Sequence, residues 1–465
     1  MAGCGGGDQP ADADPASMQL AGPSAPNIVV VMTDDQAVDT MHAMPRTRRI
    51  LGRRGTTFEA AVASFPLCCP SRASFLTGLY AHNHGVLDNS APAGGLGKLS
   101  QRDTLPVWLD RAGYRTAFIG KYLNGYGKED LGGQKFVPPG WDSWFGLTAD
   151  TKKAAFRFEV NRNGEINSLD GGAGTYKTDV LSKIGARTIA SQAERRAPLF
   201  LWLATSAPHT DSKLEGSDRN PEPAPRHRGQ FEDERAPRSR ARDERDVSDK
   251  PDFVRALPRL SDTSKKRIDL TYRSQLESLV AIDELVANLV DELRRSGELD
   301  DTLFVFTSDN GYLRGQHRIE SGKAKMYEES ILVPLLVMGP GFDSGEKVKY
   351  PVANVDLAPT IMEAAGIEPP RRLDGVPLTR PARSGGAGRD VLIEVFSRKA
   401  DQFTGVRTRR WSYAERSGDT GELYDLRRDP QQLDNLFGSE RLAGVRKRLG
   451  ERLEALRDCS GAECH

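Results

Sequence analysis

Two adjacent cysteines, Cys68 and Cys69, begin the segment CCPSRASFLTG, which ends at Gly78. Pro70 is typical of the first turn of a helix and Gly78 of a helix end, so the spacing predicts a short helix that follows Cys68. The free N–H groups and the dipole at a helix start favour an anion there. A cysteine in this place is more often structural or a simple thiol nucleophile, so the pattern alone leaves its chemistry open.

Carboxylate and amide side chains follow two apolar runs that are far apart in the chain. Asp34 and Asp35 come directly after the first run, and Asp309 and Asn310 follow the other. Oxygen ligands without cysteine or histidine suit a hard cation such as Ca²⁺ or Mg²⁺. Taken alone, each pair is more often a helix cap or a solvated turn. The four residues form one site only if their strands are neighbours.

Three further groups could bind an anion or move a proton. Lys121 comes directly after Gly120, which ends an apolar run. His209 lies in the string Ala-Pro-His-Thr after another apolar run, and Lys323 lies in the string GKAKMYE. A histidine can act as a general acid, and lysines neutralise charge that develops in a transition state. Each of them alone would more often be a structural histidine or a solvated lysine.

Buried strands that alternate with helices would position these groups. Apolar runs of strand length cover residues 27–32, 116–119, 199–204 and 303–307. Helices are expected over residues 106–112 and about 264–296. This alternation indicates an α/β fold with a largely parallel central sheet flanked by helices. Ligands bind beyond the carboxyl ends of such strands, so the polar groups are expected to meet at one sheet edge.

The composition fits a soluble globular protein. The 465 residues are 38% hydrophobic and 28% charged. Lys plus Arg equals Asp plus Glu at 65 each, so the formal net charge is zero. A global basic field for nucleic acid is therefore excluded, and an anion must be bound by a local cluster. No apolar run approaches the roughly 20 residues that span a bilayer.

Composition also divides the chain into three parts. Residues 1–25 are rich in Gly, Asp, Pro and Ala and predict a disordered leader. Residues 26–380 are expected to form the catalytic domain. After a small-residue linker at 381–388, short strand-like pieces and an amphipathic helix predict a smaller α+β C-terminal domain, with antiparallel strands, over residues 389–458.

The motifs together resemble those of the sulfatase family. Its signature, Cys-x-Pro-Ser-Arg followed by Thr-Gly, is matched at every position from Cys68 to Gly78, and GYRTAFIGK at residues 113–121 matches the second signature. The resemblance extends from about Asn27 to Leu436. It implies an alkaline-phosphatase-like fold and hydrolysis of a sulfate ester. In that family a separate enzyme converts the cysteine into formylglycine, whose hydrated aldehyde attacks sulfur.

The resemblance also assigns roles to the residues at the sheet edge. The expected metal ligands are Asp34, Asp35, Cys68, Asp309 and Asn310. The expected catalytic residues are Cys68, Arg72, Lys121, His209 and Lys323. One divalent cation is expected, Ca²⁺ in preference to Mg²⁺, and it would polarise the nucleophile and a sulfate oxygen. His209 and Lys323 are expected to assist departure of the alcohol.

One departure from the family pattern concerns sulfate release. Many sulfatases have a histidine two residues after the signature lysine, where Leu123 stands here. The run from Gly120 to Asn124 instead resembles the N-acetylglucosamine-6-sulfatase branch, which implies a 6-sulfated glucosamine in a glycan as substrate. Asn124 and His317 are candidate substrate-binding residues. Weak candidates for the elimination proton are His82, His84 and His317.

Two other functions remain open. A phosphonate-monoester or phosphodiester hydrolase of the same superfamily uses the same nucleophile on similar oxygens. An inactive glycan-binding pseudoenzyme would keep the fold without turnover, although an intact metal set beside Cys68 argues against it. A two-zinc phosphatase would need histidine-rich ligands, whereas the second metal motif here is Asp309-Asn310.

The expected partners are a sulfated small molecule or glycan and a formylglycine-generating enzyme. The mixed-charge segment 211–250 could supply hydrogen-bonding groups to a glycan. An extracytoplasmic place is favoured, because Ala-Gly-Cys at residues 2–4 resembles the end of a lipoprotein signal and Cys4 could carry a lipid anchor. A plain tail with an incidental cysteine is the alternative, and the cytoplasm is not excluded. Cys459 and Cys464 could pair in an exported protein.

Overall fold

The computed structural model describes residues 20–22, 25–148, 155–192, 197–210, 220–379, 389–396, 402–416 and 421–465. Most of the predicted leader, including Cys4, lies outside these ranges, as do the predicted linker and residues 211–219 of the mixed-charge segment. None of the helices within the ranges is both long enough and apolar enough to cross a membrane.

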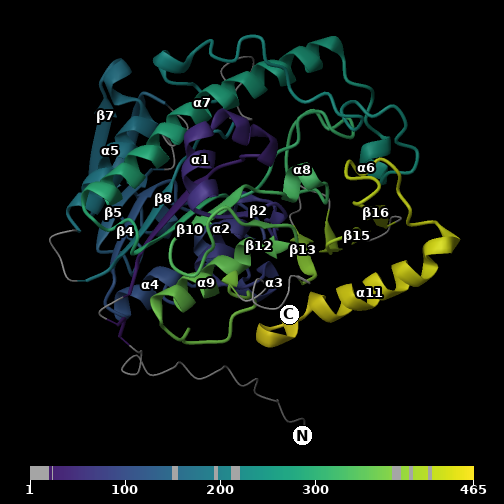
Figure 1. Ribbon diagram of the computed structural model, residues 1–465. Coiled ribbons are helices and arrows are strands. Elements are labelled where there is room, and N and C mark those ends of the chain that lie inside the picture. Colours follow the sequence, from purple (N-terminus) through teal and green to yellow (C-terminus); the bar gives the residue numbers. More distant parts are fainter. Residues whose placement is uncertain are drawn as a thin grey trace, which may run out of the picture.

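The main sheet within the described ranges has ten strands in the order β11-β2-β10-β9-β1-β8-β4-β5-β6-β7 (Figure 1). The strands are β1 (Asn27–Thr33), β2 (Gly55–Phe58), β4 (Arg115–Gly120), β5 (Ser143–Leu147), β6 (Arg157–Arg162), β7 (Glu165–Asp170), β8 (Leu199–Ala204), β9 (Thr302–Ser308), β10 (Leu335–Met338) and β11 (Lys347–Val348). The central strands β9, β1, β8, β4 and β5 run parallel. Strands β10, β6 and β7 pair antiparallel toward the edges. The α/β prediction is confirmed, with a mixed sheet whose centre is parallel.

Helices cover both faces of this sheet (Figure 1). The helices of the described residues are α1 (Pro45–Arg54), α2 (Cys68–Thr77), α3 (Ala81–His84), α4 (Leu105–Arg111), α5 (Lys177–Ala190), α6 (Asp252–Arg255), α7 (Asp262–Arg295), α8 (Glu328–Ile331), α9 (Leu357–Ala365) and α11 (Ala443–Arg457), and not all of them contact the main sheet. The expected long helix is α7, which begins after Ser261, whose side chain accepts a hydrogen bond from the Ser264 N–H. A short parallel pair, β3 (Ala61–Val62) with β12 (Val352–Ala353), lies outside the main sheet.

The alternation of side chains along β1 explains its unbroken apolar sequence. Ile28, Val30 and Met32 belong to one core cluster, and Val29 and Val31 belong to another. Successive strand residues point to opposite faces of a sheet, so a strand covered by helices on both sides needs apolar residues throughout. All seven residues of β1 are buried.

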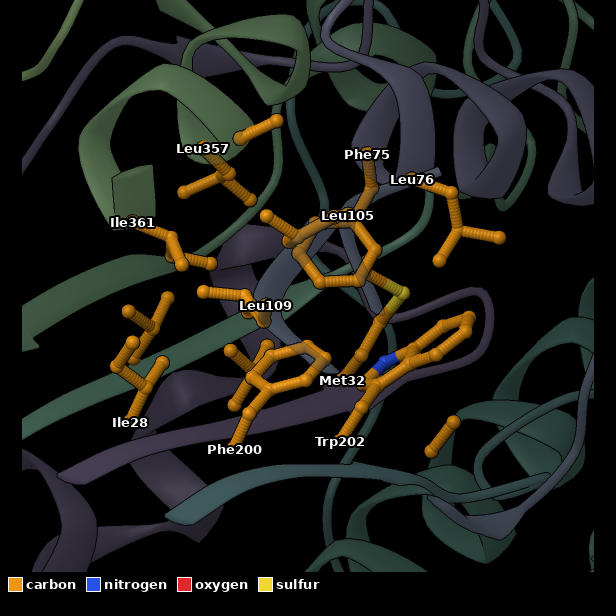
Figure 2. Packing of buried hydrophobic residues seen from close by; sticks show 14 of the residues in the cluster. Ile28, Met32, Phe75, Leu76, Leu105, Leu109, Phe200, Trp202, Leu357 and Ile361 are labelled. Carbon is orange, nitrogen blue, oxygen red and sulfur yellow. The ribbon is translucent and has the colours of Figure 1, made fainter. Parts of the chain in front are cut away.

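The first of these clusters fixes the helix that carries Cys68. Side chains of α2, α4 and α9 pack onto β1 and β8 (Figure 2). The labelled members are Phe75, Leu76, Leu105, Leu109, Leu357 and Ile361 above Ile28, Met32, Phe200 and Trp202. Every residue of α2 is buried. The helix therefore has no face on which it could shift without loss of core packing.

A smaller antiparallel sheet follows near the C-terminus. Its strands β13 (Val391–Val395), β14 (Phe403–Arg407), β15 (Trp411–Arg416) and β16 (Glu422–Asp425) pair in sequence order. Helix α11 packs against it. The sheet shares one core cluster with Phe65 and Tyr80, which flank α2 in the chain. The small unit thus packs against the segments on either side of α2, while the division of domains near residue 380 stays a prediction.

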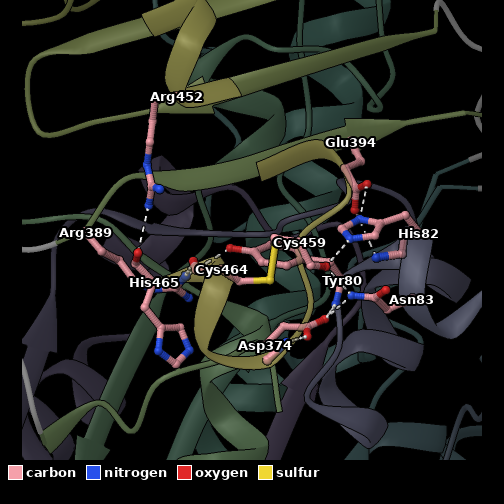
Figure 3. The surroundings of a disulfide bond; sticks show 12 residues. Tyr80, His82, Asn83, Asp374, Arg389, Glu394, Arg452, Cys459, Cys464 and His465 are labelled. Carbon is pink, nitrogen blue, oxygen red and sulfur yellow. Dashed lines mark hydrogen bonds and ion pairs between the residues drawn. A yellow bond between two sulfur atoms is a disulfide. The ribbon is translucent and has the colours of Figure 1, made fainter. Parts of the chain in front are cut away.

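The last residues of the chain are tied to α3 by a disulfide-closed loop. Cys459 and Cys464 are bonded, and the Cys459 carbonyl accepts hydrogen bonds from Asn83 Nδ2 at 2.8 Å and from His82 Nε2 at 2.9 Å (Figure 3). His82 Nδ1 lies 2.7 Å from a carboxylate oxygen of the buried Glu394 on β13. One histidine therefore joins α3, the small sheet and the terminal loop.

This contact predicts a pH-dependent stability. Burial would lower the pKa of His82, but its hydrogen bond with Glu394, the charge of that residue and the Cys459 carbonyl raise the pKa to about 9. Because this is above the unfolded value of about 6.5, the stabilisation is complete below pH 6.5 and is lost as the pH rises through 9. We expect a loss of about 1–2 kcal/mol, reduced for the partial exposure of the ring. Urea denaturation at pH 6.5 and 9 measures it.

Two variants provide the comparison. His82→Gln should flatten the pH dependence, while His42→Gln, at an exposed histidine, should leave it intact. An equal pH slope in His82→Gln and the native protein would refute this assignment.

Candidate active site

Two neighbouring strands bring the predicted acidic residues together. Thr33 at the end of β1 pairs in register with Ser308 at the end of β9. Asp35 N–H donates to Asp309 Oδ1 at 3.1 Å, and Asn310 Nδ2 donates to Asp35 Oδ1 at 2.7 Å. Asp35 has a φ of 64°, a left-handed conformation that costs free energy in a non-glycine residue and recurs at functional sites. The expected meeting of these side chains is present.

Helix α2 delivers Cys68 to the same place. The sequence placed Cys68 just before the helix, whereas the structure makes it the first helical residue, after the extended Leu67. Cys68 Sγ lies 3.4 Å from Asp34 Oδ1 and 2.7 Å from Lys323 Nζ. Gly78 ends the helix with a φ of 66°, as predicted for its position. Burial raises the pKa of the Cys68 thiol to about 12, although Lys121 and Lys323 lower it.

Arg72 lies one turn further along α2 and links three parts of the site. Its Nε donates to Asp309 Oδ2 at 2.9 Å, and its Nη1 donates to the Lys121 carbonyl at 2.5 Å. Its Nη2 lies 3.9 Å from Asp34 Oδ2 and has no hydrogen-bond partner, although it is buried. The guanidinium is fully buried and thus fixes the helix relative to the ends of β4 and β9.

The two predicted lysines are held by the two adjacent aspartates. Lys121 Nζ pairs with Asp34 and Lys323 Nζ pairs with Asp35. Burial would raise the pKa of the Asp34 carboxyl, but the positive charges of Lys121, Arg72 and Lys323 hold it well below its usual range. Burial would likewise lower the pKa of Lys323, yet Asp35 and its neighbours keep that pKa well above the usual value. Both ion pairs are therefore charged at neutral pH.

His209 follows β8 and faces the same carboxylates. Its Nε2 lies 3.5 Å from Asp35 Oδ2, and its Nδ1 is buried without a hydrogen-bond partner. Burial lowers the pKa of His209 to about 4, against the effect of Asp35 and Asp34. The imidazole is neutral at pH 7 in this arrangement.

The donor set fits a cation. One ligand atom from each of Asp34, Asp35, Cys68 and His209 lies within 4.8 Å of the others, so these residues could hold one metal ion. Asn310 Oδ1 is also buried there, and no described residue donates a hydrogen bond to it. An orphaned buried acceptor is costly, and a cation would satisfy it.

The two candidate substrate-binding residues, Asn124 and His317, differ in burial and in their contacts. Asn124 is half-buried, and its Oδ1 is enclosed without a partner. His317 is fully buried, with Nδ1 2.6 Å from Glu244 and its ring stacked on Tyr327 at 3.9 Å. The contacts of His317 are therefore those of a packed core histidine, while a substrate role for either residue stays a prediction.

The histidines suggested for sulfate release are held elsewhere. His82 contacts Glu394 and the terminal loop. His84 is half-buried, with Nε2 3.1 Å from Ser74 Oγ, and its Nδ1 accepts a hydrogen bond from the Val86 N–H. Among the described residues, Lys323 is the basic side chain within hydrogen-bond distance of Cys68 Sγ.

Sequence reasoning missed one cation near the site. Lys177, the first residue of α5, is buried and lines a cavity together with His209. A lysine at the start of a helix is ordinarily solvated, so nothing in its local sequence marks it.

Comparison with known proteins identifies the family. A family model described as Sulfatase matches residues 26–367, and one described as N-sulphoglucosamine sulphohydrolase, C-terminal, matches residues 315–459. N-acetylglucosamine-6-sulfatase of Homo sapiens is 35% identical over 389 residues, which cover 80% of this chain and 68% of the human protein.

Solved structures share the fold. A protein in complex with its substrate D-glucosamine-2-N,6-O-disulfate aligns with a TM-score of 0.77 at 24% identity, covering 92% of this chain and 97% of that one. Phosphonate monoester hydrolase of Agrobacterium radiobacter aligns with a TM-score of 0.68 at 22% identity, covering 93% and 95%.

The sheet and its helical layers have the alkaline-phosphatase-like fold. The family model covers most of the chain, and the human relative is similar along most of its own length. The chain belongs to the sulfatase family and is a sulfuric ester hydrolase, as its motifs predict.

Metal binding should stabilise the folded protein measurably. A ligand that binds only the folded state at 100 times its Kd adds about 2.7 kcal/mol to the free energy of unfolding. We therefore expect Ca²⁺ to raise the melting temperature of protein stripped with a chelator, and Asp35→Asn to abolish the rise. Asp300→Asn, which alters an exposed ion pair with Arg54, is the matched control. Equal protection of Asp35→Asn and the native protein would contradict a site at Asp35.

Proposed function

We propose that this sulfatase removes the 6-sulfate from a glucosamine unit of a glycan, with formylglycine at position 68 and one divalent cation. The observation that carries the proposal is the complete catalytic constellation around Cys68 in a chain 35% identical to an N-acetylglucosamine-6-sulfatase. The substrate is proposed from the activity for which this relative is named, and the roles below are proposed from the contacts of this chain.

Residue 68 is proposed as the nucleophile. Conversion of Cys68 to formylglycine would supply a hydroxyl for attack on sulfur. The unmodified Sγ stands where an oxygen of the converted residue would lie, 2.7 Å from Lys323 Nζ. Arg72 positions the helix start through Asp309 and the Lys121 carbonyl. The nucleophile is therefore held by residues that are themselves buried and paired.

The proposed cation site comprises Asp34, Asp35, residue 68, Asp309 and Asn310. Ca²⁺ is preferred to Mg²⁺ because the set is rich in carboxylate oxygens and Ca²⁺ accepts irregular geometry. The ion would polarise a sulfate oxygen as a Lewis acid. His209 lies close enough to Asp34, Asp35 and Cys68 to be a metal ligand as well, with Nε2 3.5 Å from Asp35 Oδ2. We propose that it acts on the substrate and does not bind the metal.

Lys121 and Lys323 are proposed to bind the sulfate group. Both ammonium groups pair with carboxylates that a cation would also use. A cation bound to those carboxylates would leave the two ammonium groups available to sulfate oxygens at the same edge. Preorganised cations of this kind stabilise charge that develops in the transition state.

His209 is proposed to act on the leaving alcohol, together with Lys323. The imidazole lies beside Asp35, and its Nδ1 has no hydrogen-bond partner among the described residues, so one ring nitrogen is proposed to face the ester oxygen. A hydrogen bond to that oxygen would assist its departure as an alcohol.

A phosphonate-monoester hydrolase is the second candidate. The observation that favours it is the fold shared with such an enzyme at a TM-score of 0.68. Phosphoryl and sulfuryl groups present similar oxygens to the same cations, so only turnover separates the two functions.

An extracytoplasmic location is proposed on chemical grounds. The bond between Cys459 and Cys464 persists in oxidising compartments and is rare in the cytosol. The same proposal includes a lipid anchor at Cys4 and a formylglycine-generating enzyme as a partner.

The modification predicts a difference between the two adjacent cysteines. Active protein should carry an aldehyde at position 68 and a thiol at Cys69, as read by mass spectrometry of the tryptic peptide. Cys68→Ala should lower kcat by at least about a thousandfold, because the nucleophile is lost. Cys69→Ala, at the buried neighbour, should retain activity within about tenfold. Full activity in Cys68→Ala would overturn the mechanism.

Substrate choice is tested by direct comparison. We expect kcat/KM for N-acetylglucosamine-6-sulfate to exceed that for nitrophenyl sulfate and for a phosphodiester on the same preparation. A preference for the phosphodiester would favour the second candidate. A preference for the aryl sulfate would support sulfatase activity and contradict the proposed glycan substrate.

A further inference from the structure

The segment that carries His209 is held by the protein on both sides of the histidine. Before it, the Asp34 N–H donates to the Ala207 carbonyl at 3.3 Å, which ties the segment to the end of β1. After it, the hydroxyl oxygens of Thr210 and Tyr312 lie 3.1 Å apart, and both residues are buried. A hydrogen bond between two side chains therefore fixes the residue that directly follows His209.

The imidazole itself has few contacts that would fix its direction. A functional histidine is commonly oriented by a hydrogen bond that its second ring nitrogen makes to a carbonyl or a carboxylate. No described residue makes that bond to Nδ1 of His209, and Nε2 lies 3.5 Å from Asp35 Oδ2. The direction of the ring therefore depends on the backbone of residues 208–210 and on the side chains that hold it.

Tyr312 is itself fixed by its place just after β9. The preceding residue, Gly311, donates its N–H to the Ser330 carbonyl at 3.0 Å. A Cβ atom at Gly311 would lie 2.3 Å from the Glu329 carbonyl oxygen, so the backbone here is too closely packed to shift. The Tyr312 side chain is only 5% exposed. Its hydroxyl thus gives the histidine segment a partner whose position is set by the same strand end that carries the acidic residues.

The long helix α7 contacts the segment on the other side of the histidine. Gln275 is fully buried, and its Nε2 lies 3.5 Å from the Pro208 carbonyl. Its Oε1 accepts a hydrogen bond from Arg314 Nη1 at 3.3 Å, and Arg314 also pairs with Asp39. Two elements that are distant in the chain therefore meet the residues before and after His209.

We propose that Tyr312 is a positioning residue for His209. Through Thr210, its hydroxyl holds the imidazole where it can donate a hydrogen bond to the ester oxygen as the sulfur–oxygen bond breaks. This inference rests on the role proposed above for His209 at the leaving alcohol. Tyr312 does not touch the reacting atoms, so its loss should slow the esters whose leaving group most needs that hydrogen bond and spare the others.

Two aryl sulfates of similar size separate this role from a general weakening of the enzyme. 4-Nitrophenolate is a weak base and leaves without help, whereas 4-methoxyphenolate is a stronger base and gains from a hydrogen bond. We expect Tyr312→Phe to lower kcat/KM for 4-methoxyphenyl sulfate by about ten- to a hundredfold, part of the total effect of general acid catalysis. The value for 4-nitrophenyl sulfate should stay within about threefold of the native one. N-acetylglucosamine-6-sulfate, whose alcohol is the poorest leaving group, should lose at least as much as the methoxyphenyl ester.

Three comparisons make the result specific. Thr210→Val should reproduce the effect of Tyr312→Phe, whereas Thr210→Ser, which keeps the hydroxyl, should retain the native ratio of the two aryl sulfates. Tyr114→Phe is the matched control, because the Tyr114 hydroxyl also donates one buried hydrogen bond, to the Pro26 carbonyl at 3.0 Å. That bond lies just before β4 and β1 begin, at the opposite ends of the strands from the site. Its loss should lower stability and leave the ratio unchanged.

A variant of His209 completes the test. His209→Ala should change the ratio in the same direction as Tyr312→Phe and by more, and addition of Tyr312→Phe to His209→Ala should change it no further. An equal loss on both aryl sulfates, an unchanged ratio in Tyr312→Phe, or a further change in the double variant refutes the positioning role. If Tyr312→Phe does not fold, as judged by its thermal transition, Thr210→Val decides in its place.

Failure of the proposed function would look different. A native ratio in His209→Ala refutes the role proposed for His209, and the inference about Tyr312 with it. Turnover of both aryl sulfates without turnover of any glucosamine sulfate refutes the proposed substrate, while the ratio of the aryl sulfates still decides the role of Tyr312.

Discussion

Burial of opposite charges at one sheet edge constrains the rest of this structure. Asp34, Asp35 and Asp309 are removed from water, and so are Arg72 and Lys121. Each would be costly alone, and removal of one partner from such a pair typically costs about 3–5 kcal/mol. The cluster is therefore stable only when strands and helix place every partner at once. That requirement explains why the centre of the sheet and α2 tolerate so little movement.

The fold meets this requirement through packing on both sides of the sheet. The parallel strands β1 and β9 end together, and β8 and β4 end beside them, so the polar residues after each strand share one edge. The apolar cluster under α2 fixes the helix from below. The small sheet and the terminal loop support it from the other side, through Phe65, Tyr80 and the contacts of His82. Precision at the nucleophile thus depends on layers that never touch the substrate.

Much of this arrangement could be predicted from the sequence because the signals are local. The continuous apolar runs of β1, β4, β8 and β9 could only be strands buried on both faces, and each ends within a residue or two of its expected limit. The two signature strings marked Cys68, Arg72 and Lys121, and strand ends marked the acidic residues.

Other features depend on residues that are distant in the chain. The antiparallel strands β6 and β7 have mixed polar sequences without a continuous apolar run and depend on their neighbours for pairing. Lys177 has an ordinary sequence context, and only the fold places it beside His209. The pairing of His82 with Glu394 spans most of the chain, and no local pattern encodes it.

A crystal structure of the matured enzyme with Ca²⁺ and inorganic sulfate tests the central claim most directly. The account predicts one ion among Asp34, Asp35, Asp309 and Asn310, with sulfate held by Lys121 and Lys323 next to residue 68. An ion bound elsewhere, or sulfate bound away from residue 68 while both lysines still pair with Asp34 and Asp35, would contradict it.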